Sequence, residues 1–247
     1  MLRYASACLI AAAVVAAPVS ASSPAVPQAV AQAAQFAAAT NAGAVVHERH
    51  IDVNASAGPA HFSQSNEALL LMIDGTYKHI HYSKIVENGK PVSADEVAKR
   101  ENQNNADFDR GAGFFKQPFD RRYLAEYAYD VVPCTGCAAG VAAVHFTSSM
   151  RDDQHGDGIM HIESATGRVL DLHYTPFVFP EHANSGTTTE TFGEPIAGLW
   201  TIVRIDRVYG GRVLFVSGHG TMAEVLDHFH RFPDQSAGVA FYRSSTL

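Results

Sequence analysis

Residues 158–174, GIMHIESATGRVLDLHY, carry the pattern that decides the fold. Apolar and polar residues alternate on both halves of this stretch, and the residues between them, Ala165-Thr166-Gly167-Arg168, are typical of a turn. Successive side chains of a strand point to opposite faces, so the alternation predicts an antiparallel β-hairpin with one buried and one solvated face. We expect the buried face to hold Met160, Ile162, Leu170, Leu172 and Tyr174, and the solvated face to hold His161, Glu163, Asp171 and His173.

Similar strand patterns lie on both sides of this hairpin. Asp74-Gly75 and Asn88-Gly89 are strong signals for hairpin turns, and Gly210-Gly211 predicts a two-residue turn between the segments beside it. Residues 221–232 fit either a helix or a last strand. The other segments with a strand pattern are 45–53, 61–63, 69–73, 77–86, 123–132, 141–148, 199–208 and 212–217.

Two helices are expected in the first half of the chain. Residues 28–40 are rich in alanine and are followed by Asn41 and Gly43, which favour the end of a helix. Ser93 and Glu96 have the spacing of a capping box, which predicts a second helix from there to about residue 104. This second helix is mostly polar, so we expect it at the surface, as part of a lid.

These segments predict an α+β fold that is predominantly β. About nine to eleven strands would form a single curved antiparallel sheet, an unclosed barrel, with an N-terminal and an interposed helix. Two helices can cover only part of the apolar face of such a sheet. The uncovered part would form an apolar groove, a shape suited to hydrophobic ligands.

The N-terminus predicts export. Arg3 precedes an apolar run over residues 5–17, and Val19-Ser20-Ala21 is a small-x-small cleavage site, so residues 1–21 are interpreted as a signal peptide. Residues 22–247 would then form one domain in the periplasm or outside the cell. The apolar run is shorter than the ~20 residues that span a bilayer, and we expect no transmembrane segment.

The charge of the chain argues against polyanionic partners. The formal net charge is −7, and the Lys and Arg residues are scattered along the chain. Nucleic acids and anionic membranes bind concentrated basic patches, so neither is expected as the main partner.

Cys134 and Cys137 are the two cysteines beyond the predicted signal peptide, and they have the spacing C-x-x-C. In an oxidising compartment this spacing favours a disulfide across a tight turn, with Thr135-Gly136 at the bend. A redox centre, a metal site and free thiols are the alternatives. The redox alternative is the weaker because residues 141–146 after the pair have the pattern of a strand, whereas a thioredoxin-like pair begins a helix.

The histidines raise the question of a metal. The chain has 13 of them, and His79/His81 and His228/His230 are each two residues apart, which places both members of a pair on one face of a strand. A zinc site needs three or four convergent ligands, and polar strand faces also use histidine, so no metal ligand is assigned. The cluster Asp152, Asp153, His155 and Asp157 is interpreted as a solvated hairpin loop rather than a calcium site.

Residues 105–123 form an irregular, aromatic-rich connection. Its phenylalanines would either contact a ligand or plug one end of the sheet, and Trp200 is expected in the core. The ligand-contact interpretation assigns a binding site to Phe108, Phe114, Phe115, Phe119, Leu170, Leu172 and Tyr174.

The order of these segments resembles the LolA/LolB superfamily of periplasmic proteins. The chain has the same order of segments as that superfamily: an export signal, an N-terminal helix, consecutive antiparallel strands, an interposed helix and further hairpins. In addition, residues 158–172 are similar to the superfamily's mid-sheet hairpin. The resemblance implies a LolA-like domain over residues 22–247, with an acyl chain, another hydrophobic ligand or a lipoprotein as its partner and no catalysis. None of the superfamily's gating residues matches a position here.

The sequence therefore predicts an exported, non-catalytic protein that binds or carries a lipophilic ligand in an apolar groove, without a cofactor. One alternative is a metal- or thiol-dependent enzyme that uses the histidine pairs or the pair Cys134/Cys137. Another is a protein-interaction module whose partner covers the sheet.

Overall fold

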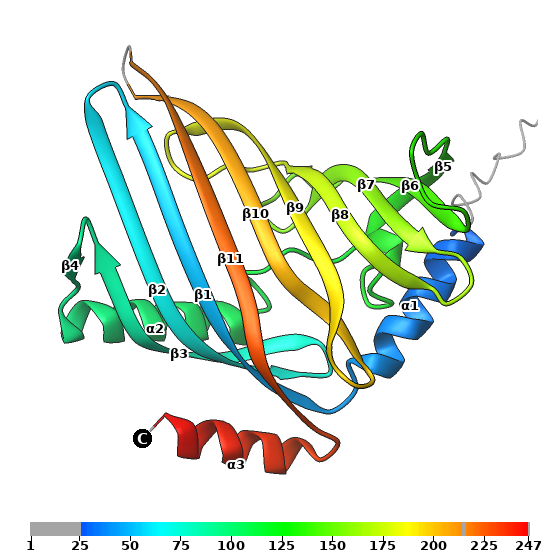
Figure 1. Ribbon diagram of the computed structural model, residues 1–247, viewed down its shortest axis with the longest axis horizontal. Helices are drawn as coiled ribbons and strands as arrows, with labels where there is room; N and C mark the ends of the chain where they lie inside the picture. The colour runs from blue at the N-terminus through cyan, green and yellow to red at the C-terminus, as the bar shows by residue number, and fades with distance from the viewer. Residues whose placement is uncertain (1–25, 214–215, 247) are drawn as a thin grey trace, which may run out of the picture.

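Within residues 26–213 and 216–246, which the computed structural model describes, eleven strands form one antiparallel sheet that does not close into a barrel (Figure 1). The predicted fold class is confirmed. The strand order is β4-β3-β2-β1-β11-β10-β9-β8-β7-β6-β5. The predicted signal peptide, residues 1–21, lies outside the described residues.

The strands vary widely in length. They are β1 (Ala44–Ala57), β2 (Ala60–Ile73), β3 (Thr76–Glu87), β4 (Lys90–Pro91), β5 (Tyr127–Val132), β6 (Val141–Ser148), β7 (Gly156–Glu163), β8 (Arg168–Pro176), β9 (Ala183–Ile196), β10 (Leu199–Val213) and β11 (Val216–Phe232). The helices in the described part of the chain are α1 (Gln28–Thr40), α2 (Ala94–Asp109), α3 (Gln235–Ser245) and a 3-10 turn, η1 (Leu124–Glu126).

The path of the chain places β4 and β5, which are consecutive strands, at opposite edges of the sheet. Strands β1 to β4 lead out to one edge, and β5 begins at the other edge. Residues 92–126, which include α2 and the aromatic-rich connection, therefore cross from edge to edge. Strands β5 to β11 then return until β11 pairs with β1.

Helix α2 protects the exposed edge of β3. Its N-cap Ser93 accepts a hydrogen bond from the backbone N–H of Glu96, as the capping box predicts. The side-chain amide of Asn105 bonds both the N–H and the C=O of Ile80, at 2.8 and 3.2 Å, and Glu101 accepts from the N–H of Tyr82 at 3.1 Å. These polar side chains take the place of a neighbouring strand, and so they satisfy an edge that could otherwise pair with another chain.

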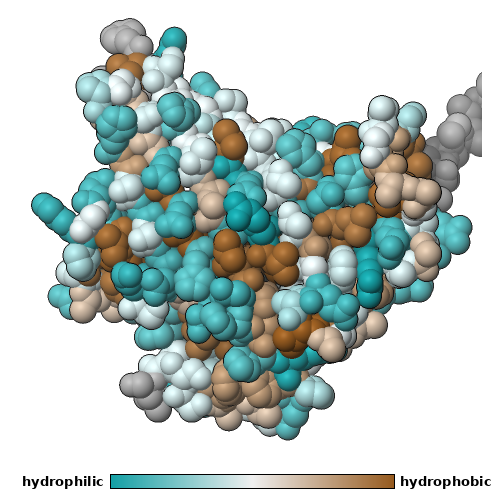
Figure 2. All heavy atoms as spheres, viewed as in Figure 1, coloured by the Kyte–Doolittle hydropathy of each residue, from teal (hydrophilic) through white to brown (hydrophobic). Residues whose placement is uncertain are grey.

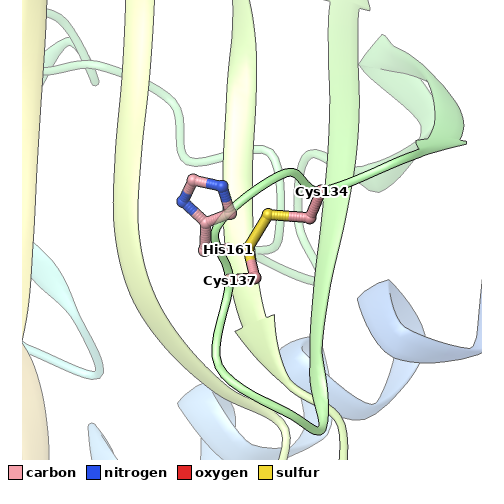
Figure 3. A group of neighbouring side chains, drawn as sticks. All are labelled: Cys134, Cys137 and His161. Atoms are coloured by element: carbon pink, nitrogen blue, oxygen red, sulfur yellow. A yellow bond between two sulfur atoms is a disulfide. The ribbon is translucent and has the colours of Figure 1, made fainter.

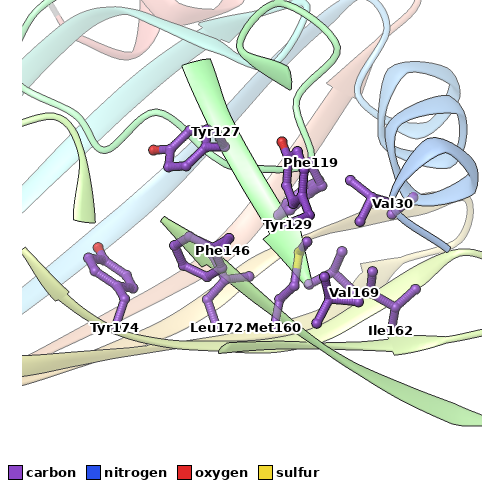
Figure 4. Packing of buried hydrophobic residues seen from close by; sticks show 12 residues of the cluster. Val30, Phe119, Tyr127, Tyr129, Phe146, Met160, Ile162, Val169, Leu172 and Tyr174 are labelled. Carbon is purple, nitrogen blue, oxygen red and sulfur yellow. The ribbon is translucent and has the colours of Figure 1, made fainter. Parts of the chain in front are cut away.

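The largest core cluster lies on the inner face of β5 to β8. Side chains from β7 and β8 point together toward Phe119, Tyr127 and Val30 of α1 (Figure 4). Met160, Ile162 and Leu172 are fully buried there. The predicted buried face of the hairpin is confirmed for these residues and for Tyr174, and His161 and Asp171 bond each other on the opposite face.

The prediction was wrong for Leu170. The register between β7 and β8 shifts after His161, so His161 faces Asp171 while Ile162 faces Val169. Leu170 is the extra residue of a β-bulge and is only half-buried, and Val169 takes the core position instead.

Three other parts of the chain differ from the prediction. Gly210-Gly211 lies inside β10, and Val213 pairs with Val216 further along the chain. Strand β9 was not predicted, because its inward residues Thr188 and Glu190 are polar although buried. The predicted strands 61–63 and 69–73 belong to one continuous β2, while residues 221–232 form the last strand, which is one of the two alternatives left open by the sequence.

Helix α3 was also not predicted, and it packs on the opposite face of the sheet from α1. Tyr242 of α3 is buried with Ala44, Val46 and Leu71 of β1 and β2. Gly238 lets the helix approach closely, since a β-carbon there would collide with that of Ala44. On the face seen in Figure 2, apolar patches are broken up by polar residues, and none of the described helices is long and apolar enough to cross a membrane.

A buried histidine fastens the aromatic-rich connection to the sheet. His155 is fully buried, with Nδ1 at 2.5 Å from Asp152 and Nε2 at 2.6 Å from Glu126. Lys116 also reaches Glu126, at 3.1 Å. The predicted solvated loop is thus wrong for His155, which joins this loop to Glu126 and, through Glu126, to Lys116 of the aromatic-rich connection.

We predict that Leu172→Asp and Asp171→Asn differ sharply in stability. Leu172 is fully buried, so an aspartate there would be an unpaired buried carboxylate and should cost more than about 3 kcal/mol. Asp171 pairs with His161 on the solvated face, where such a pair contributes less than about 1 kcal/mol. Urea unfolding of both variants measures the difference, and equal free energies of unfolding would contradict the assignment of faces.

We also predict that acid weakens the contacts around His155. Burial acts to raise the pKa values of Glu126 and Asp152, but hydrogen bonds outweigh it and hold both pKa values below their usual range. Glu126 is bonded by His155 and Lys116, and Asp152 is bonded by His155. Lowered folded-state pKa values give stability that is present above the unfolded values of about 4 and is lost as pH falls below them.

The double variant Glu126→Gln/Asp152→Asn should therefore lose less stability between pH 6 and pH 3 than the wild type, as measured by urea unfolding. Asp153→Asn, in the same loop and solvent-exposed, is the control and should follow the wild-type profile. A double variant with the wild-type slope would show that these carboxylates do not govern the acid response.

Candidate functional site

A cleft of about 630 Å³ opens between α1, the turn from β2 to β3, and the aromatic-rich connection. Its apolar wall includes Ala37 and Ala38 of α1, Met72 of β2, and Phe192 and Ile202 of β9 and β10. The alanine-rich sequence of α1 makes the cleft possible. One face of the helix packs Val30 and Ala33 into the core, and the small alanine side chains beside the cleft leave space for it.

Trp200 lines this cleft, so its predicted place in the core was wrong. The side chain is half-buried, and its Nε1 donates to the carbonyl of Val169 at 2.7 Å. Its ring meets that of Phe36 edge to face, with centroids 6.5 Å apart. The guanidinium of Arg168 lies 4.7 Å from the Trp200 ring centre and 5.8 Å from that of Phe36, which fixes both rings beside the cleft.

Charged residues surround the cleft. Asp120 is paired with Arg122, whose guanidinium also contacts the β2 to β3 turn at Thr76. Lys78 and Arg121 line the cleft as well, and neither forms an ion pair with any described residue. The described lining holds three cations, Lys78, Arg121 and Arg122, and two carboxylates, Asp74 and Asp120, so its formal charge is positive.

The structure brings three of the seven residues of the sequence-derived binding site to this cleft. Phe114, Phe115 and Phe119 line it. Phe108 instead stacks on Tyr77 in a separate core cluster, with ring centroids 5.6 Å apart.

The other three residues of that set lie elsewhere. Tyr174 and Leu172 belong to the core behind the cleft, where Phe115 stacks on Tyr174 at 3.9 Å. Leu170 is displaced by the bulge. Sequence reasoning missed Phe192 and Trp200 because the first lies on the unpredicted β9 and the second resembles an ordinary core residue.

A buried polar group lies next to the aromatic lining. Glu190 of β9 is almost fully buried and accepts hydrogen bonds from Gln117, at 2.7 Å, and from Tyr174, at 2.9 Å. Burial raises the pKa of Glu190, and these two bonds act in the opposite direction. Further along the inner face, Glu224 pairs with Arg207 at 3.3 Å. The inner face of the sheet is thus apolar at the cleft and polar beyond it.

Cys134 and Cys137 are joined in a disulfide, with their Cα atoms 5.6 Å apart. His161 lies beside the bond, as Figure 3 shows, and its other neighbour is Asp171. The disulfide interpretation of the C-x-x-C pair is confirmed. The two sulfurs are bonded to each other, so they offer no thiolate to a metal or a substrate.

The histidine pairs predicted from spacing do not converge as pairs. His79 stacks on Tyr242 with ring centroids 6.0 Å apart, while His81 bonds Glu101 at 3.0 Å. His230 packs against Phe241, and His228 points to a different set of residues.

His47 belongs to the core instead. Burial against Phe229 lowers the pKa of His47 to about 4, so its ring is neutral at physiological pH. The sequence offered no signal that separates this histidine from the others.

Comparisons with known proteins concern the fold alone. No family model and no curated protein matches the sequence. Among solved structures, a DUF1329 family protein from Desulfovibrio piger is 11% identical, with a TM-score of 0.40 over 85% of this chain and 97% of that one.

Two further solved structures are similar. A LolA superfamily protein from Nitrosomonas europaea is 8% identical, with a TM-score of 0.36 over 83% of this chain and 93% of the other. A putative outer membrane lipoprotein-sorting protein domain from Vibrio parahaemolyticus is 10% identical, with a TM-score of 0.41 over 81% and 91%. A LolA superfamily protein is thus among the solved structures that are similar to this chain, and at these TM-scores the similarity carries no argument about function.

Proposed function

We propose that this protein binds an amphiphile with an acyl chain and an anionic head in the cleft beside α1, as a non-catalytic carrier or binding protein of the periplasm. The observation that carries the proposal is the cleft itself, an apolar cavity of about 630 Å³ with cations at its border that pair with no carboxylate in the described part of the chain. Its size falls within the ~300–1,000 Å³ of typical ligand pockets. The N-terminal sequence supports export to the periplasm.

The apolar part of the ligand would lie against the aromatic wall. Phe114, Phe119 and Trp200 offer large apolar surfaces, and the alanines of α1 leave room beside them. Burial of each CH₂ group contributes ~0.8 kcal/mol, so a chain of several carbons would bind without any polar contact.

The head of the ligand would lie at the border of the cleft. Lys78 and Arg121 are free to pair with a carboxylate or phosphate, since no described residue neutralises them. The two carboxylates at the border are engaged within the protein: Asp120 pairs with Arg122, and Asp74 accepts from the backbone of Gly43 and from Gln235. Three cations of the lining, Lys78, Arg121 and Arg122, outnumber these two carboxylates, so an anionic head meets net attraction there and a cationic amphiphile is disfavoured.

We predict that the purified protein binds one molecule of a long-chain fatty acid, and that Ala38→Trp abolishes this binding. The new indole would occupy the cleft, because Ala38 lines it. Isothermal titration with a fatty acid, or displacement of an environment-sensitive dye, measures the affinity.

Ala39→Trp is the matched control. Ala39 is the next residue of α1, it is exposed, and it does not line this cleft, so the variant should bind like the wild type. Phe114→Ala should weaken binding by more than about 1 kcal/mol, since it removes an aromatic ring from the wall. The proposal would be contradicted by a folded wild type that binds no fatty acid, or by an equal loss of affinity in both tryptophan variants. A partner protein that co-purifies and covers the sheet would instead favour an interaction module.

We further predict that Arg121→Gln weakens the binding of a fatty acid but not of the fatty alcohol of the same length. An exposed ion pair contributes up to ~1 kcal/mol, so the loss should be at most about fivefold, and it should shrink with added salt. Arg110→Gln is the control, because Arg110 pairs with Asp107 and does not line the cleft. Equal effects on acid and alcohol would show that the border of the cleft does not select a charged head.

A further inference from the structure

Four side chains with metal-binding atoms meet on the outer face of the sheet, where β1 pairs with β11. They are Glu48, His50, Asp227 and His228, and one ligand atom from each lies within 4.8 Å of the others. Nε2 of His50 is 3.7 Å from Glu48 and 3.4 Å from Asp227. Nδ1 of His228 is 3.2 Å from each of the same two carboxylates.

An irregularity in the pairing creates this arrangement. Val46 pairs with His230 but Glu48 pairs with Asp227, so β11 has an extra residue in a β-bulge. His228 is at the bulge and adopts a left-handed backbone, with φ 48°. The bulge turns His228 toward His50, whereas His230 packs under α3 against Phe241.

The spacing of the ligand atoms matches a tetrahedral metal ion. Zinc lies at ~2.0–2.2 Å from histidine nitrogens and carboxylate oxygens, which places neighbouring ligand atoms of a tetrahedron about 3.3 Å apart. The four nitrogen-to-oxygen distances given above span 3.2–3.7 Å. Imidazole and carboxylate ligands suit zinc and its neighbours among the first-row divalent ions better than calcium, which prefers oxygen ligands alone.

The charge of the group also points to a cation. Among the described residues, no Lys or Arg forms an ion pair with Glu48 or Asp227, although these two carboxylates lie within reach of each other. The four side chains are between 38% and 67% exposed, so an ion can enter directly from solvent. The cluster is separate from the cleft, whose lining includes none of its members.

We propose that Glu48, His50, Asp227 and His228 bind one zinc ion, or a similar first-row divalent ion, that links the first and the last strand of the sheet. The ligands come from opposite ends of the described chain. Metal binding would therefore stabilise the pairing of β1 with β11, by an amount that grows with the logarithm of the free metal concentration above the dissociation constant. The site is independent of the proposed ligand cleft and does not rest on it.

The test uses untagged full-length mature protein, treated with chelator and kept without reductant so that the disulfide stays closed. We expect one equivalent of Zn²⁺ by isothermal titration, a visible spectrum of tetrahedral Co²⁺, and a rise in melting temperature on adding Zn²⁺. His228→Asn and His50→Gln should each weaken binding by at least about tenfold, since even groups that only orient a metal ligand affect affinity by ~10- to 100-fold. Asparagine tolerates the left-handed backbone, so His228→Asn should fold normally in chelator.

The matched control is His79→Asn/His81→Asn, which removes the other two-residue histidine pair and should bind Zn²⁺ like the wild type. No binding by the wild type, or unchanged binding by His228→Asn and His50→Gln, would reduce the group to a surface cluster of ion pairs. Loss of binding only in Cys134→Ser/Cys137→Ser would show that binding depends on the region of the disulfide and His161 instead, and would also overturn the proposal.

Discussion

The pairing of β1 with β11 is the contact on which the rest of the structure depends. It joins strands from the two ends of the described chain, from Ala44 with Phe232 to Ala57 with Gly218. Without it the remaining strands would be two separate meanders, β1 to β4 and β5 to β11, each with an unpaired central edge. With it they become one wide sheet, whose twist curves the inner face toward residues 92–126.

The same constraint determines where a ligand can bind. The chain has to cross from β4 to β5, and its crossing segment fills much of the inner face with Phe108, Phe115 and Phe119. Binding at the mid-sheet hairpin, which the alternation of residues 158–174 suggested, is therefore blocked by the protein's own side chains. Space remains where this segment meets the small residues of α1, and there the polar border and the apolar wall lie side by side.

The features that the sequence predicted well are those in which a local pattern and the final environment agree. Three such features are the alternation around Met160, the capping box at Ser93 and the alanine-rich helix α1. In each of them the residues make the contacts that their local pattern predicts. The predictions failed where distant residues decide. Glu190 is polar but buried because Gln117 and Tyr174 bond it, and Gly210 reads as a turn but lies opposite Ser185 and His219 in a continuous strand. The sequence around Glu190 or around Gly210 does not indicate which distant residues will be its partners.

The β1 to β11 pairing also affects how the protein can fold. A chain that emerges N-terminus first presents β1 long before β11 is available, and β1 contains the buried residues Val45, Val46 and Ile51. Until the last strand arrives, one edge of β1 stays open to pairing with other chains, which is the usual route to aggregation. Completion of the sheet has to wait for contacts of very high sequence separation, so folding should be slow for a protein of this size and should benefit from a chaperone that holds the early strands apart.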